Sequence, residues 1–151
     1  MQTWLPLSEQ FVHGLVSRSR HPSMVVARLP LQNTDEFPHD PVHSLGAIPT
    51  ILPPAFERRL VTAAFFMLTA RNRPGLVHHH HGYRCLDPVG FVRRRRVPFV
   101  LSLHGEDVTA YVTRWPGALD DALACASAVV VPSQYLAGER KRSELRGGSS
   151  G

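Results

Sequence analysis

Two short apolar runs in the middle of the chain each end abruptly in histidine followed by glycine. The first is LVHHHHG over residues 76–82, and the second is FVLSLHGED over residues 99–107. The pattern predicts two buried strands whose last residues carry imidazoles to the rim of a sheet. In an open parallel sheet, ligands bind just beyond the carboxyl ends of the strands. The two runs therefore predict a ligand site at that edge.

Helical patterns separate these runs and continue after them. We expect a helix from about residue 85 to 95, a helix near 117–126, a strand over 128–131, and a last helix over 134–141 that Ser133 caps. Strands and helices that alternate at such short intervals form right-handed crossovers in a parallel sheet. The near-continuous Val and Leu content of the strands is typical of a sheet with helices on both faces. The expected fold class is therefore α/β, with a Rossmann-like parallel sheet.

The first half of the chain predicts fewer elements around a proline-rich stretch. Ser8 and Glu9 open a helix with an oxygen cap and an early acid, and apolar residues then recur at helical spacing. The other expected elements are a strand over 24–27, a short strand near 42–45 and a well-buried helix over 55–71. One side of this helix carries Phe56, Leu60, Ala63, Ala64, Met67 and Leu68, and Phe65 and Phe66 widen its apolar surface. Six prolines between residues 29 and 54 predict mostly irregular surface between these elements.

The composition limits the class of protein. With 151 residues and 43% hydrophobic content, the chain can bury the core of one domain. No apolar run approaches the roughly 20 residues that a membrane-spanning helix needs. The two cysteines, Cys85 and Cys125, lie far apart in the sequence, and we expect them to be free thiols in a reducing cytoplasm.

Basic charge is concentrated in the middle third of the chain. Residues 51–100 contain nine arginines and two acids, and Arg93–Arg96 form a run at the end of an expected helix. Such a charge attracts phosphates, anionic lipid or nucleic acid, but a solvated helix end is the simpler interpretation of the run. Nucleic acid is disfavoured because no aromatic residues interleave with the basic ones. A peripheral position at the inner, anionic face of a membrane stays open.

The four consecutive histidines raise the question of a metal site. Alternate side chains of a strand share a face, so we expect His78 and His80 on one face and His79 and His81 on the other. Two imidazoles on one face could hold a metal with a third ligand such as His104 or Asp107. We do not expect a metal here, because no carboxylate or thiol lies at close spacing to the run.

The segment His104-Gly105-Glu106-Asp107 has two interpretations. In the first, Gly105 allows a positive φ or a close approach of ligand to the backbone, and His104 donates or accepts a proton near neutral pH. The amides that follow would then face an anion at the start of a helix. In the second, the segment is a strand-to-helix turn in which Asp107 merely caps the helix. The residues alone favour neither.

Four motifs occur in a fixed order along the chain: PLSEQF over residues 6–11, LVHHHHG over 76–82, SLHGEDV over 102–108 and AVVVPS over 128–133. Together they resemble the N-terminal, acceptor-side domain of the retaining GT-B glycosyltransferases of family four. The match covers most of residues 4–140. The resemblance implies a Rossmann-like domain that forms one side of a cleft, with the nucleotide-sugar donor held mainly by a second domain.

The resemblance also implies roles for individual residues. His104 matches the cleft histidine that lies against the transferred sugar, and is the implied catalytic residue. The implied substrate-binding residues are Ser8 and Glu9 on the phosphate side of the cleft, His78, His80 and Gly82 at the end of the first histidine strand, and Gly105 and Asp107, which shape the loop after the second. The family generally needs no bound metal, and no cofactor is implied.

The implied reaction is transfer of a hexosyl group from a nucleoside diphosphate sugar to a hydroxyl of a saccharide or lipid acceptor, with retention of configuration. We expect residues 1–142 to be a fragment of that domain and 143–151 to be a flexible tail. The first strand and the donor-binding domain are expected to be missing. The fragment would then be inactive alone, although its parent would be an enzyme. The alternative is a non-catalytic α/β module that binds a phosphorylated or saccharide ligand.

Overall fold

The computed structural model describes residues 10–27, 31, 33–45, 54–82, 86–131 and 133–134. The chain divides into two compact units, Met1–Leu68 and Thr69–Gly151. Ser8 and Glu9, the expected helix over 134–141 beyond Gln134, and the expected tail over 143–151 lie outside the described residues. The expected single domain over residues 1–142 stays a prediction.

The first unit contains a pair of short parallel strands and a helix that packs with them. Helix α1 (Gln10–Ser17) precedes β1 (Val25–Ala27), which pairs with β2 (Val42–Ser44). The core of this unit contains Val12 and Ala27, with four partly buried side chains packed against them: Val16, Val25, Phe37 and Val42. Leu15 is 55% exposed, so the apolar face predicted for α1 is only partly used in the core.

Helix α2 (Pro54–Ala70) confirms the longest helical prediction, but the prediction of its buried side was wrong. Phe56, Leu60 and Met67 are exposed, whereas Val61, Phe65 and Thr69 are buried. The buried residues recur every four positions and therefore share one face of the helix. Apolar residues occur nearly all round α2, so hydrophobic spacing alone could not select which face is buried.

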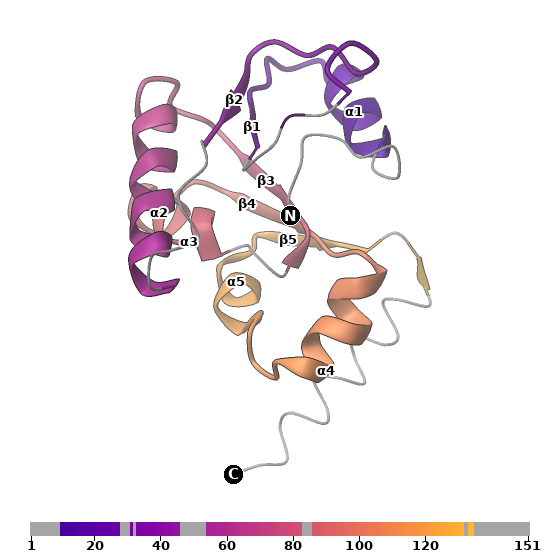
Figure 1. The fold of residues 1–151 in the computed structure, drawn as a ribbon, viewed down its shortest axis with the longest axis vertical. Helices are drawn as coiled ribbons and strands as arrows, with labels where there is room; N and C mark the ends of the chain where they lie inside the picture. The colour runs from indigo at the N-terminus through magenta and orange to yellow at the C-terminus, as the bar shows by residue number, and fades with distance from the viewer. Residues whose placement is uncertain are drawn as a thin grey trace. The chain divides into compact units, whose positions relative to one another are not determined.

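The second unit contains a three-stranded parallel sheet in the order β3-β4-β5 (Figure 1). The strands are β3 (Val77–His80), β4 (Phe99–Ser102) and β5 (Ala128–Val130). Helix α3 (Leu86–Arg95) connects β3 to β4, and α5 (Asp120–Cys125) lies between β4 and β5. The two helices contact each other as well as the strands, so they cover the same face of the sheet.

The core of the second unit lies between these helices and the sheet. Phe99 and Leu101 are fully buried and alternate along β4, which places both on one face. Phe91 and Val92 of α3 and Ala122 of α5 are buried as well. Burial of a large apolar side chain stabilises a fold by about 1.5–3 kcal/mol. The apolar runs recognised in the sequence therefore form the centre of this unit.

An arginine links the two covering helices at the surface. Arg93 of α3 donates to the carboxylate of Asp121 at 2.9 Å and to Sγ of Cys125 at 2.8 Å, both on α5. These hydrogen bonds, first that to Asp121, raise the pKa of the guanidinium. The first arginine of the run therefore has a structural partner, whereas a wholly solvated run was the simpler expectation. Cys125 is a free thiol, as predicted, and is half-buried.

The structure confirms an α/β fold with small parallel sheets, and the predicted strands and helices that fall on the described residues lie close to their expected positions. One element was not among those predicted: a π-helical turn, η3 (Asp107–Tyr111), continues into α4 (Val112–Arg114). None of the helices in the described residues is long and apolar enough to cross a membrane.

Candidate functional site

Strand β3 places the first three histidines of the run on alternating faces of the sheet. The rings of His78 and His80 lie on one face with their centroids 4.3 Å apart. On the same face, Nε2 of His78 lies 2.8 Å from Oγ of Ser102 in β4, which is hydrogen-bond distance. His79 pairs with Leu101 in the parallel register and therefore shares the opposite, apolar face. This part of the predicted alternation is confirmed.

The prediction that His81 shares the face of His79 is wrong. His81 has a φ of 70°, in the left-handed region, because it follows the last residue of the strand and begins the turn to Gly82. Its ring lies 4.3 Å from the ring of His104. A single residue in this conformation breaks the two-residue periodicity of a strand. His81 therefore joins the imidazoles at the carboxyl edge.

Strand β4 delivers His104 to the same edge. The ring of His104 is stacked on that of His80, with centroids 5.8 Å apart. His78, His80, His81 and His104 thus form a chain of ring contacts across the ends of β3 and β4, which we call the imidazole cluster. The sequence predicted His78, His80 and His104 at this edge, but it did not indicate that Ser102 or His81 belongs to the site.

Gly105 begins a helical turn directly after His104. The positive φ that its sequence position allowed is not used. A Cβ placed on Gly105 would meet no atom within 4 Å, so open space adjoins this part of the backbone. The second possibility raised by the sequence, a close approach of ligand to the backbone here, stays a prediction.

Asp107 holds the ends of both strands with one carboxylate. Its side chain is fully buried, and its two oxygens accept hydrogen bonds from the backbone amides of Gly82 at 2.7 Å and His104 at 2.8 Å. The bond to His104 reaches back three residues to the start of the helix, as in one half of a capping box. Asp107 therefore has no surface for a ligand, and acts through the two loops that it holds.

Gly82 is fixed by packing as well as by this hydrogen bond. A Cβ on Gly82 would lie 2.8 Å from a methyl carbon of Leu103 and 2.8 Å from one of Leu119. Real side chains essentially never approach so closely, so the position is closed to any residue with a side chain unless both leucines move. Packing thus explains why a glycine follows the histidine run, and the implied contact of Gly82 with substrate stays a prediction.

The histidines of β3 have lowered pKa values. Burial, and then the neighbouring histidines His81 and His78, lower the pKa of His79 to about 4, while a backbone hydrogen bond with His81 acts in the opposite direction. Burial and four neighbouring histidines, first His78, lower the pKa of His80 to about 3. Burial also lowers the pKa of His78. These three rings are therefore neutral near pH 7.

The described residues contain no group of three or more His, Cys, Asp or Glu side chains arranged to hold a metal ion. Nε2 of His79 is buried and makes no hydrogen bond to the described residues. This nitrogen lies on the apolar face of the sheet, away from the imidazole cluster, because His79 shares its face with Leu101. A neutral imidazole has one donor and one acceptor nitrogen, so His78 and His80 are suited to ligands that hydrogen-bond in both senses.

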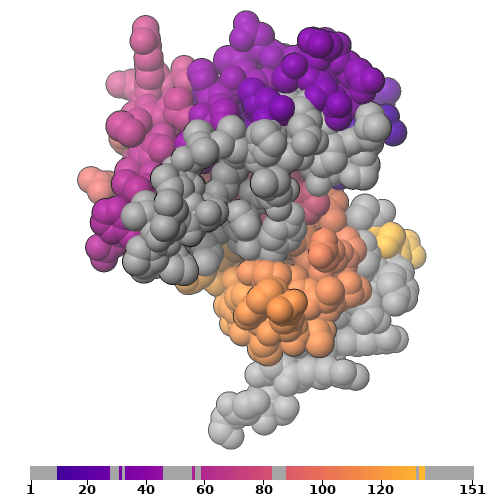
Figure 2. Space-filling model, in the orientation of Figure 1, coloured from indigo at the N-terminus to yellow at the C-terminus, as the bar shows by residue number. Residues whose placement is uncertain are grey.

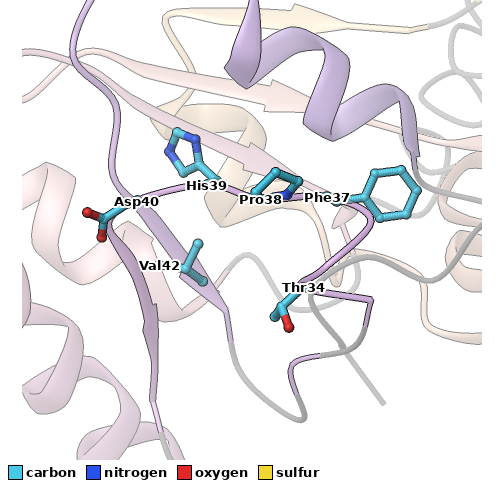
Figure 3. Close-up of a pocket in the computed structure, with 6 residues that line it drawn as sticks. All are labelled: Thr34, Phe37, Pro38, His39, Asp40 and Val42. Carbon is cyan, nitrogen blue, oxygen red and sulfur yellow. The ribbon is translucent and has the colours of Figure 1, made fainter.

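A hollow of about 390 Å³ lies elsewhere, in the first unit (Figure 3). Its lining is Thr34, Phe37, Pro38, His39, Asp40 and Val42. The carboxylate of Asp40 and the ring of Phe37 point in opposite directions in Figure 3, and Nε2 of His39 lies 3.2 Å from the carbonyl oxygen of Ser23. The polar groups do not converge, so this hollow is a weaker candidate than the imidazole cluster.

In Figure 2 the orange surface belongs to the segment that carries α4 and α5. An exposed aromatic residue directly follows α4 in the sequence. Trp115 is 49% exposed, and the guanidinium of Arg114 lies 4.7 Å from the centre of its ring. The ring of Tyr111 lies 5.2 Å away and is tilted.

No family model, curated protein or solved structure matches this chain. The chemistry of the imidazole cluster therefore rests on its own residues.

Proposed function

We propose that the carboxyl edge of β3 and β4 binds hydroxyl groups of a saccharide, and that the chain forms the acceptor side of a retaining hexosyltransferase. One observation carries this proposal: four imidazoles meet at the ends of two parallel strands whose loops are fixed by the buried carboxylate of Asp107. Sites in α/β sheets lie at this edge. The finer fold that we propose is a Rossmann-like sheet to which β3, β4 and β5 belong.

The protonation of His78 and His80 supports a neutral, hydroxyl-bearing ligand. A hydroxyl group both donates and accepts a hydrogen bond, as does a neutral imidazole. The rings of His78 and His80 carry no charge near pH 7, because burial lowers their pKa values. They would therefore bind a sugar ring better than a phosphate, which requires positive charge or oriented amides.

In the proposed reaction, a hexosyl group passes from a nucleoside diphosphate sugar to an acceptor hydroxyl with retention. His104 would contact the sugar, with the rings of His80 and His81 as its support. Asp107 would keep the amide and ring of His104 in place through the hydrogen bond at 2.8 Å. The charge that develops on the diphosphate must be stabilised electrostatically, and the roles implied for Ser8 and Glu9 stay predictions. Groups beyond this site would supply most of that stabilisation.

One observation favours the alternative, a non-catalytic module that binds a saccharide or phosphorylated ligand. Asp107, the carboxylate beside the imidazoles, is fully buried and cannot exchange a proton with a bound ligand directly. A binding module needs no such group. The two functions share the imidazole cluster and differ in turnover.

Binding is tested by NMR with histidine-labelled protein and a panel of methyl hexosides. We expect saturable shifts of the imidazole signals of His80, His81 and His104. His104→Ala should weaken binding by about tenfold, the equivalent of one or two lost hydrogen bonds. His21→Ala, at an exposed histidine of the first unit, is the matched control. Equal affinity of His104→Ala and the unaltered protein would show that the site is assigned wrongly.

Turnover separates the two functions. The protein expressed from its natural gene is incubated with radiolabelled nucleoside diphosphate hexoses and the saccharide that binds. Transfer of label that His104→Ala abolishes supports the transferase. Saturable binding with no transfer for any donor supports the non-catalytic module.

A further inference from the structure

The edge of the sheet opposite the imidazole cluster collects arginines. Arg71 and Arg73 lie between α2 and β3, and Arg94–Arg96 end α3 and precede β4. The starts of β3 and β4 are level, because the strands are parallel and the amide of Val77 donates to the carbonyl of Pro98 at 2.9 Å (Figure 1). All five arginines are exposed, and we call them the amino-edge arginines.

The two described segments that carry these arginines contain no acidic residue of their own. Residues 69–76 and 93–98 include six arginines and neither Asp nor Glu. The sixth, Arg93, is held by Asp121 and Cys125. Asp121 pairs with Arg93 at 2.9 Å, whereas Glu106 and Asp107 lie in the helical turn that follows β4, at the carboxyl edge. Arginines therefore outnumber acids in the described segments of the amino edge.

Two of the amino-edge arginines have a backbone conformation that favours glycine. Arg73 has a φ of 41° and Arg96 a φ of 54°. Each follows the end of a helix and precedes a strand, a position at which glycine is the usual residue. A residue with a side chain costs on the order of 1 kcal/mol there. Folding alone would thus favour glycine at both positions, so the two charged side chains indicate a use outside the fold.

We propose that the amino-edge arginines bind the phosphate groups of an anionic lipid surface. Leu76 is 52% exposed on the segment that also carries Arg71 and Arg73, and it would enter the headgroup layer. A guanidinium can bind a phosphate through two parallel hydrogen bonds. Neither segment contains an aromatic side chain on which a base could stack, so a single-stranded nucleic acid fits this edge less well. This proposal does not depend on the proposed sugar site.

The test is co-sedimentation of the full chain with large unilamellar vesicles of phosphatidylcholine containing 30% phosphatidylglycerol. Each basic side chain near an anionic surface contributes a factor of about five to partitioning. Arg73→Gln/Arg96→Gln should therefore lower the partition coefficient about 25-fold. High salt should have the same effect on the unaltered protein, because it screens the attraction. Vesicles of phosphatidylcholine alone should bind neither protein.

Two variants separate the patch from net charge and from stability. Arg18→Gln/Arg20→Gln removes the same charge from exposed arginines of the first unit and should leave the partition coefficient unchanged. Arg96→Gly relieves the backbone and should melt no lower than the unaltered protein, yet lose about fivefold in partitioning. Equal losses for the two double variants, or no binding to the anionic vesicles, would overturn the proposal. So would tighter binding to DNA than to vesicles at the same salt, with the same dependence on Arg73 and Arg96.

Discussion

The carboxylate of Asp107 accepts a hydrogen bond at 2.7 Å from the backbone amide of Gly82, 25 residues earlier in the chain. The other oxygen of the same carboxylate accepts from the amide of His104. One buried side chain therefore joins the loop after β3 to the loop after β4. His81 precedes one of these amides and His104 carries the other, so the relative position of the two histidines depends on Asp107.

Asp107→Asn should destabilise the protein by about 2–3 kcal/mol. The amide nitrogen of asparagine is a donor, so one of the two buried backbone amides loses its acceptor and faces another donor. The free energy of unfolding in urea measures the loss. Glu106→Gln, at the exposed neighbouring position, should change it by less than about 0.5 kcal/mol. Similar effects of the two substitutions would contradict the role assigned to Asp107.

Gly82→Ala and Gly105→Ala should change the stability of the protein in opposite directions. An added methyl group at Gly82 meets Leu103 and Leu119 at 2.8 Å, and overpacking of this kind costs about 1–3 kcal/mol. At Gly105 the added methyl group meets nothing within 4 Å, and alanine in a helical turn is favoured by about 0.5–1 kcal/mol. Thermal unfolding compares the two. If Gly105→Ala is at least as stable as the parent but binds methyl hexosides more weakly, ligand approaches the backbone at this residue.

His79 should make the protein less stable in acid. Its pKa is about 4 in the folded state, against about 6.5 in the unfolded chain. The unfolded state therefore binds more protons between these values, and the free energy of unfolding falls as the pH drops from about 6.5 to 4. The full difference is about 3 kcal/mol, and it levels off below pH 4. Urea titrations across this range measure it.

His79→Leu should remove this part of the pH dependence. The leucine would share the face of Leu101, and the buried Nε2 without a hydrogen bond would be gone, which should add about 1 kcal/mol at pH 7. His80, with a pKa of about 3, would still contribute a slope from about pH 6.5 down to about pH 3, so the slope between pH 6.5 and 4 should decrease without vanishing. His21→Leu, at an exposed site, serves as the control. An unchanged slope between pH 6.5 and 4 in His79→Leu would show that His79 is not the titrating group.

The strands and most helices could be predicted because the apolar positions in the sequence are the positions that are buried in the structure. Phe99 and Leu101 alternate in the sequence and are fully buried in β4. Helix α2 shows the limit of this approach, because it is apolar on several sides and the wrong face was chosen. The helical turn from Gly105 to Arg114 has its first buried residues at Asp107 and Val108, so apolar spacing gave no indication of it.

The sequence predicted where the candidate site lies, but it predicted the arrangement of the side chains there only in part. Strand alternation placed His78 and His80 correctly but failed at His81, because a turn conformation is not encoded in alternation. The sequence offered Asp107 as a cap for its own helix; the hydrogen bond to Gly82 depends on the pairing of β3 with β4, and no local pattern reports such a contact. Ser8 and Glu9 lie outside the described residues, and their implied role stays a prediction.

Strand β3 is only four residues long, which corresponds to about 10 Å from its first residue to its last. The amino-edge arginines lie at one end of this strand and the imidazole cluster at the other. A protein bound to lipid through its arginines would hold its histidines little more than a sugar unit or two above the headgroups. Water-soluble donors could still reach them there, and so could an acceptor that remains embedded in the bilayer by its tail.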